Sequence, residues 1–338
     1  LRTDLDLFEQ VWTDRPTLPT HAIYEHLPPH ATLARANKLA HLRLAMQASG
    51  ADWHVLSTLD AIAYLFNLRG ADVNYNPIFV AHALVGLQQA TIFVADGKVP
   101  AQVVAALAAD DVQLAPYASA ASALAALAAD AVLLFDPRRI TLGLRRAVPD
   151  SIRVVEAINP TTFAKSRKSA AEAAHVRRTM EQDGAALCEF FSWLDEALEN
   201  EVVTELTIDE QITAARARRP GFVCPSFGTI AGFNANGAMP HYHATPAAHA
   251  VIEGDGLLLI DSGGQYLGGT TDITRIVPVG QPTAAQRRDV TLVLKGVIAL
   301  SSTQFPRGTR APMLDAIARA PIWSAGSDYG PLSYHRIT

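Results

Sequence analysis

The sequence is poor in the residues that mark several classes of protein. It holds two cysteines in 338 residues, Cys188 and Cys224. Two are too few for a disulfide framework, so we expect reduced thiols in the core of a cytoplasmic protein. Only 18% of the residues are charged, with 28 basic against 33 acidic side chains and a net charge of −5. This balance, without a long basic stretch, argues against nucleic acid as a partner.

Long apolar runs are missing as well. No window reaches the roughly 18 uninterrupted apolar residues that a membrane span requires. Residues 1–6 lack the apolar core of a signal peptide. Hydrophobic residues nevertheless make up 49% of the chain, which is typical of a globular protein with sizeable cores. The length favours two domains, and no membrane partner is expected.

The pattern along the chain divides it into three parts. Residues 1–30, rich in proline and histidine, are expected to form a linker arm. In residues 31–158, β-type runs alternate with helical segments, which predicts an α/β domain. The Ala-rich segment 101–129 is expected to be helical within it. Residues 159–338 place helices before strands, which predicts an α+β domain, so the fold class is α/β plus α+β.

Two capping boxes mark helix starts in the last part. Ser169 with Glu172 is expected to open a long helix to about residue 198. Thr207 with Glu210 is expected to open a second helix that stops before Pro220. The pattern then changes to strands, at 229–233, 251–252, 256–260 and 271–279, and ends in helices at about 284–300 and 310–319.

Two aspartates in the run 257–275 carry the strongest chemical signal. Asp261 ends an apolar strand, glycines turn the chain, and a second strand brings back Asp272. An aspartate beside Gly-Gly is usually a turn residue of a surface hairpin. A buried carboxylate, however, is costly without a partner, and two converging carboxylates repel each other unless a cation joins them. The spacing therefore favours a divalent metal site.

A group of histidines precedes this hairpin. His241 could be a metal ligand, an acid–base group or an ordinary strand-edge residue. Strand alternation would place His241 and His243 on one face. His249 fits the ordinary interpretation of a solvated loop histidine.

Several motifs together resemble one known family. They are Thr-Ile-Ala-Gly at 229–232, Asn-Ala-Asn-Gly-Ala at 234–238, Ile-Asp-Ser-Gly-Gly-Gln-Tyr at 260–266, Gly-Thr-Thr-Asp-Ile-Thr-Arg at 269–275, Trp-Thr-Asp-Arg-Pro at 12–16 and the run 58–72. The chain resembles Xaa-Pro aminopeptidase (aminopeptidase P) of the three-domain type, a pita-bread metallopeptidase, over about residues 5–330. The resemblance implies a creatinase/prolidase-like domain over 31–158 and a pita-bread peptidase domain over 159–338.

The resemblance also implies roles for single residues. Asp261 and Asp272 match the first two metal ligands of the family, and His241 matches a histidine that contacts substrate and steadies the tetrahedral intermediate. His335 falls in register with a metal-binding histidine. Arg69 lies in a region that is near the substrate or the dimer contact in relatives; an ion pair with Asp72 is the alternative. The implied cofactor is two divalent ions, typically manganese, with a bridging hydroxide that attacks the carbonyl before proline. The implied partners are peptides with proline at the second position, and a second copy in a homodimer.

The chain departs from the family at both ends. Three-domain relatives carry another domain before the 12–16 motif, and after Gly330 they continue with a His-Gly-rich motif and strands bearing two glutamate ligands. Here residues 331–338 read Pro-Leu-Ser-Tyr-His-Arg-Ile-Thr. We therefore expect a chain without the first domain and with a truncated peptidase domain. The alternative function is a catalytically impaired pita-bread protein that binds peptides or proteins. Further alternatives are a prolidase, and a metal-free relative acting on small amidino compounds, against which the aspartate pair speaks.

Overall fold

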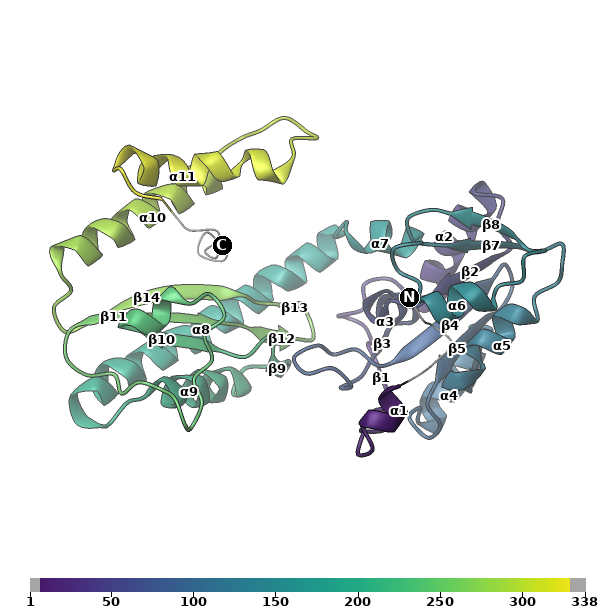
Figure 1. Cartoon of the computed structure of the whole chain (residues 1–338), viewed down its shortest axis with the longest axis horizontal. Helices are drawn as coiled ribbons and strands as arrows, with labels where there is room; N and C mark the ends of the chain where they lie inside the picture. The colour runs from purple at the N-terminus through teal and green to yellow at the C-terminus, as the bar shows by residue number, and fades with distance from the viewer. Residues whose placement is uncertain (1–6, 329–338) are drawn as a thin grey trace. The chain divides into compact units, whose positions relative to one another are not determined.

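A computed structural model describes residues 7–328. The chain separates into two compact units, residues Leu1–Ala173 and Ala174–Thr338, and Figure 1 shows their elements. The division falls inside the long helix α8 (Ala170–Asn200). No helix within the described range is both long and apolar enough to cross a membrane.

The first unit is built on a six-stranded mixed sheet in the order β6-β5-β4-β2-β7-β8 (Figure 1). Its strands are β2 (Trp53–Leu56), β4 (Ala81–Gly86), β5 (Ala90–Val94), β6 (Val112–Pro116), β7 (Val132–Phe135) and β8 (Arg153–Glu156). Its helices are α1 (Phe8–Val11), α2 (Arg35–Ala48), α3 (Leu59–Phe66), α4 (Ala101–Ala108), α5 (Ala120–Ala125), α6 (Leu142–Ala147) and α7 (Pro160–Lys165), with the short η1 (Tyr117–Ser119). The end of the expected arm takes part in this unit, because β1 (Tyr24–Glu25) pairs with β3 (Leu68–Arg69).

The segment 101–129 is not helical throughout, so that prediction is wrong in its middle. Strand β6 runs parallel to β5 there, with Val112 opposite Ala90. Val112 is buried in the apolar cluster of the first unit. Pairing with a neighbouring strand and burial of this side chain outweigh the helix propensity of the surrounding alanines.

The second unit combines helices with two three-stranded sheets (Figure 1). The main sheet has the order β10-β11-β14, and the smaller sheet has the order β13-β12-β9. The bounds are α8 (Ala170–Asn200), α9 (Glu205–Ala217), β9 (Phe222–Pro225), β10 (Ile230–Phe233), η2 (Asn234–Ala238), β11 (Gly256–Ser262), β12 (Gly264–Tyr266), β13 (Gly269–Thr270) and β14 (Ile273–Val279). After them come α10 (Ala284–Ser302), η3 (Ala311–Met313) and α11 (Asp315–Ser324).

One capping prediction is confirmed and the other is wrong. At α8 the Ser169 amide donates to the Glu172 carboxylate, and the Glu172 amide donates to the Ser169 hydroxyl. Helix α9 starts earlier than expected, because Thr204 is its N-cap and Thr207 occupies the third helical position of that box. The Thr207 hydroxyl accepts from the Thr204 amide, so it already serves an earlier cap.

The main sheet of the second unit has two unlike faces. Alternate residues Ala231, Phe233, Leu258 and Ile260 join the apolar core formed with α8 and α9. On β11 the alternate residues Leu257, Leu259 and Asp261 point to the opposite face and are only partly buried. The expectation of two core thiols fails for Cys188, which is exposed on α8, whereas Cys224 is partly buried.

Candidate metal and peptide site

The two aspartates lie on one face of the main sheet. Asp261 on β11 stands opposite Thr274 on β14, and Asp272 is two residues before Thr274, just ahead of that strand. Because side chains alternate along extended chain, Asp272, Thr274 and Asp261 share one face. Such a diagonal pair has Cα atoms about 7–8 Å apart. Asp261 is partly buried and Asp272 is exposed, so both carboxylates are available to a hard cation.

The turn between the aspartates is fixed by hydrogen bonds to its own backbone. The Thr271 hydroxyl accepts from the Gly264 amide at 2.9 Å, and the Ser226 hydroxyl donates to the Thr271 carbonyl at 2.8 Å. A Cβ atom on Gly263 would lie 2.0 Å from the Thr271 carbonyl oxygen and 2.3 Å from the Ser226 hydroxyl. Only glycine lets the chain close this turn, which holds Asp261 and Asp272 in register.

The roles of Ser226 and Thr271 were not predicted from the sequence. Thr271 lies in the motif at 269–275, yet nothing in its spacing from Ser226 indicated a bond between them. The Gly-Gly pair at 263–264 was the available signal, because glycine often marks close approach of two backbones.

His241 lies on an exposed loop between η2 and β11. The loop is not a strand, so the expectation that strand alternation places His241 and His243 on one face is wrong. The loop begins on the same face as Asp261: a Cβ atom on Gly232 would meet the Gly237 backbone at 2.7 Å. Gly232 pairs with Leu259, two residues from Asp261. The chain thus starts the His241 loop over the aspartate face of the sheet.

Arg69 has a structural environment in the first unit. Its guanidinium donates to the carbonyls of Leu68 at 2.9 Å and Ala63 at 3.2 Å. Burial lowers the pKa of this guanidinium, and the nearby Tyr24 opposes that shift. The alternative for Arg69, an ion pair with Asp72, is wrong, because the Asp72 carboxylate pairs with Lys98, and both side chains are almost fully buried. The Val80 amide donates to the same Asp72 oxygen at 2.7 Å.

The donor set of the candidate site is suited to a divalent metal. Asp261 and Asp272 supply hard carboxylate oxygens on one face, which suits the chemistry of such an ion. Between residues 7 and 328, no group of three or more His, Cys, Asp or Glu side chains could hold a metal ion. His335 lies outside the described residues. The described chain therefore contributes a pair of suitable ligands to such a site.

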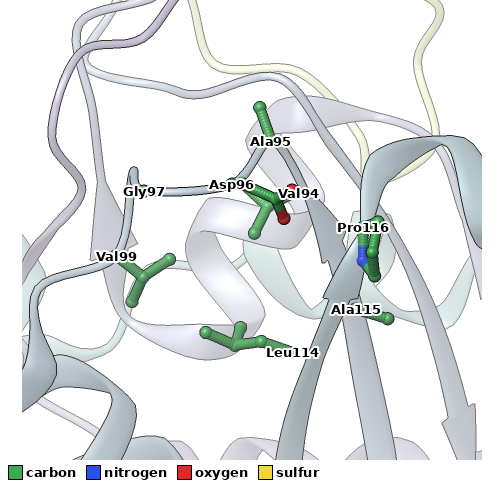
Figure 2. A pocket seen from close by; sticks show the side chains of 8 residues that line it. All are labelled: Val94, Ala95, Asp96, Gly97, Val99, Leu114, Ala115 and Pro116. Atoms are coloured by element: carbon green, nitrogen blue, oxygen red, sulfur yellow. The ribbon is translucent and has the colours of Figure 1, made fainter.

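A pocket in the first unit is separate from these residues. It has a volume of about 160 Å³ and lies beyond the carboxyl ends of the parallel strands β5 and β6 (Figure 2). Val94, Val99 and Leu114 give it apolar walls, and Asp96 is its one charged lining residue. The residues that line this pocket include a single carboxylate and none of the predicted site residues.

Comparison with known proteins identifies the family. Residues 14–172 match the creatinase/prolidase N-terminal domain, and residues 174–337 match metallopeptidase family M24. The chain belongs to family M24. Its fold is accordingly a creatinase-type N-terminal domain followed by a pita-bread domain, as the sequence motifs predicted, and the resemblance to Xaa-Pro aminopeptidase P is confirmed.

Individual M24 relatives agree with this assignment. The chain is 37% identical to a probable Xaa-Pro aminopeptidase P of Neosartorya fischeri over 346 residues, covering 96% of this chain and 51% of that protein. It is 36% identical to the probable Xaa-Pro aminopeptidase P of Sordaria macrospora, covering 96% of this chain and 55% of that protein. The chain spans about half the length of these curated relatives.

A solved structure extends the comparison to three dimensions. The X-prolyl aminopeptidase of Caenorhabditis elegans, described as a cytosolic enzyme with a di-nuclear active site, superposes with a TM-score of 0.88 at 27% identity. The match covers 95% of this chain and 53% of that one. The two described units therefore correspond to about half of that enzyme.

Proposed function

We propose that this chain forms part of a metal-dependent aminopeptidase that removes an N-terminal residue linked to proline. One observation carries the proposal. Asp261 and Asp272 share a sheet face from which the His241 loop also starts, in a chain homologous to Xaa-Pro aminopeptidase P.

In this proposal the aspartates bind the metal. Asp261 and Asp272 hold two divalent ions, manganese by family, with His335 as a further ligand. When bound, such ions supply a hydroxide nucleophile and polarise the scissile carbonyl. The Gly263 turn keeps the two carboxylates in register, so that neither must reorganise when the ions bind.

His241 and Arg69 are proposed to act on the peptide. His241 is exposed on the loop that starts over the aspartate face, and it is proposed to donate a hydrogen bond to the substrate carbonyl as negative charge develops there. Arg69 binds on the N-terminal side of the peptide. Proline's tertiary amide lacks an N–H, so a site of this kind does not require backbone pairing at that position. The proposed setting is cytoplasmic, with a homodimer as the assembly.

Metal binding and peptide cleavage test the proposal together. Manganese titration by calorimetry should give binding that Asp261→Asn and Asp272→Asn each weaken at least about tenfold. Asp289→Asn, at an exposed position of α10, is the charge-matched control and should bind as the parent chain does. Unchanged manganese affinity in Asp261→Asn would refute the metal assignment.

The substrate is tested with three peptides in the presence of manganese. Cleavage of an Xaa-Pro-Xaa tripeptide, but not of an Xaa-Pro dipeptide or an Xaa-Ala-Xaa tripeptide, is the expected result. Cleavage of the dipeptide alone would indicate a prolidase. Binding of the tripeptide without cleavage would indicate the alternative function, a peptide-binding module.

A further inference from the structure

We propose that Glu205 is the positioning residue for the His241 loop, holding residues 233–250 over the aspartate face through Tyr242 and the two ends of the loop. This inference rests on the proposed function for the role of His241. It concerns a residue on α9 that no motif singled out, some 36 residues before His241 in sequence.

The Glu205 carboxylate is buried and surrounded by donors. Glu205 is 1% exposed. One oxygen accepts from the Phe233 amide at 2.8 Å and the Asn236 side-chain amide at 3.0 Å. The other accepts from the Tyr242 hydroxyl at 2.7 Å and the Ala250 amide at 2.7 Å. A buried charge with this many hydrogen bonds is stable, whereas an unpaired one would not be.

These four donors come from the whole length of the loop. Phe233 is the last residue of β10, where the loop begins, and Ala250 lies at the far end of the loop. One carboxylate therefore joins the two ends of the loop. Asn236 and Tyr242 come from its interior. The backbone near Glu205 reinforces the closure, because its amide donates to the Ala250 carbonyl at 3.1 Å and the Ile252 amide donates to the Val203 carbonyl at 2.9 Å.

The arrangement requires an ionised carboxylate. Burial alone raises the pKa of Glu205, but the bonds from Phe233, Tyr242, Ala250 and Asn236 outweigh it, and the pKa lies below its ordinary value. Both oxygens face donors only. A glutamine at this position would turn its own NH₂ group toward two donors, so Glu205→Gln loses more than charge.

Tyr242 transmits the effect to His241. Its hydroxyl donates to Glu205 and accepts from the Asn236 amide at 3.0 Å, and it is the residue next to His241. Burial, with the bond to Glu205, raises the pKa of Tyr242 to about 12, so this donor keeps its proton at neutral pH. Removing the hydroxyl releases the attachment nearest His241 and leaves those at Phe233 and Ala250 in place.

The first experiment measures the loop itself. Hydrogen exchange of residues 239–250 should accelerate in Tyr242→Phe by roughly 3- to 10-fold, because one charge-assisted hydrogen bond is lost. Tyr117→Phe, in the first unit, is the matched control and should leave exchange in this loop unchanged. Because phenylalanine retains the ring, this variant remains informative even where Glu205→Gln fails to fold.

The second experiment measures turnover of an Xaa-Pro-Xaa peptide with manganese. Tyr242→Phe should lower kcat by roughly 3- to 10-fold with KM and manganese affinity unchanged. The reason is that the His241 side chain, which this variant displaces, acts in the transition state. Glu205→Gln should lower kcat further. Unchanged loop exchange and unchanged kcat in Tyr242→Phe would overturn the inference and leave the proposed function standing. A parent chain that neither binds manganese nor cleaves the peptide contradicts the proposed function. Hydrogen exchange of residues 239–250 then still tests the positioning role of Glu205.

Discussion

The main sheets of the two units differ in how their faces are covered. In the first unit both faces carry apolar clusters: Ile92 and Leu134 face one cluster, and Phe93 and Leu133 face the other. In the second unit α8 and α9 cover one face, while the opposite face keeps Ile276 39% exposed beside the aspartates. A sheet with two covered faces has little room for a polar site. The open face of the second sheet is where ligand chemistry can take place.

Polar residues follow the same division. In the first unit His54 is fully buried, with its ring nitrogens 3.0 Å from the Leu134 carbonyl and 3.1 Å from the Asn159 side-chain oxygen. That histidine supports the sheet internally and has no access to solvent. In the second unit Asp272 and His241 are exposed. Burial therefore distinguishes residues that maintain the fold from residues that can meet a substrate.

The largest expected effect compares the same substitution on the two sheets. Ile92→Ala, at a residue 1% exposed on β5, should lower the free energy of unfolding by about 2–5 kcal/mol, because it leaves a cavity between packed layers. Ile276→Ala, on the open face, should cost about 1 kcal/mol or less. Urea denaturation followed by tryptophan fluorescence measures both.

Equal costs at the two positions would contradict the comparison. They would mean that Ile276 is covered in solution, and the face that carries Asp261 would then be closed. The slope of the unfolding free energy against urea serves as the control, since it should not change when only packing is lost.

The elements of both units were largely predictable where local pattern and tertiary contacts agree. The helix opened by Ser169 and Glu172 was predictable because its cap lies within four residues. The strand at 112–116 was not, since its reason is pairing with β5, which no local pattern reveals. The start of α9 was misplaced because Thr204 and Thr207 both fit a cap, and only the fold selects between them.

The candidate site was predictable in its ligands and not in its supports. Asp261 and Asp272 stood out because carboxylates at strand ends are chemically conspicuous. Glu205 did not, since a glutamate in the first helical turn looks like ordinary helix capping. Its bonds to Phe233 and Ala250 depend on long-range folding. Lys98 as the partner of Asp72 was missed for the same reason.

The next effect concerns the turn that joins the two aspartates. Gly263→Ala should lower the free energy of unfolding of the second unit by roughly 1–3 kcal/mol, because the added Cβ meets the Thr271 carbonyl and the Ser226 hydroxyl. It should also weaken manganese binding by spreading the carboxylates.

Gly184→Ala is the matched control: it lies inside α8, where an added Cβ meets nothing within 4 Å. The control should stabilise the unit by about 0.5–1 kcal/mol. Similar destabilisation in both variants would show that the turn is not specially constrained.

The smallest effect separates the units by their response to acid. Burial lowers the pKa of His26, with further lowering by the charges of Arg69, His30 and Lys38, from 6.5 to about 4; burial also lowers the pKa of His54 and His82. A histidine with a lowered folded pKa stabilises the fold above about pH 6.5, and this contribution falls away as the pH drops toward the folded value. The lowered pKa of Glu205 acts in the same direction, but only below its ordinary value of about 4.3.

Between pH 7 and pH 5, hydrogen exchange corrected for its intrinsic pH dependence should therefore accelerate in the first unit and not around Glu205. His26→Gln should reduce the acceleration, because glutamine does not titrate. If exchange around Glu205 accelerates as much as exchange in the first unit over this range, the acid response does not follow the buried histidines, and the two units do not differ in this respect.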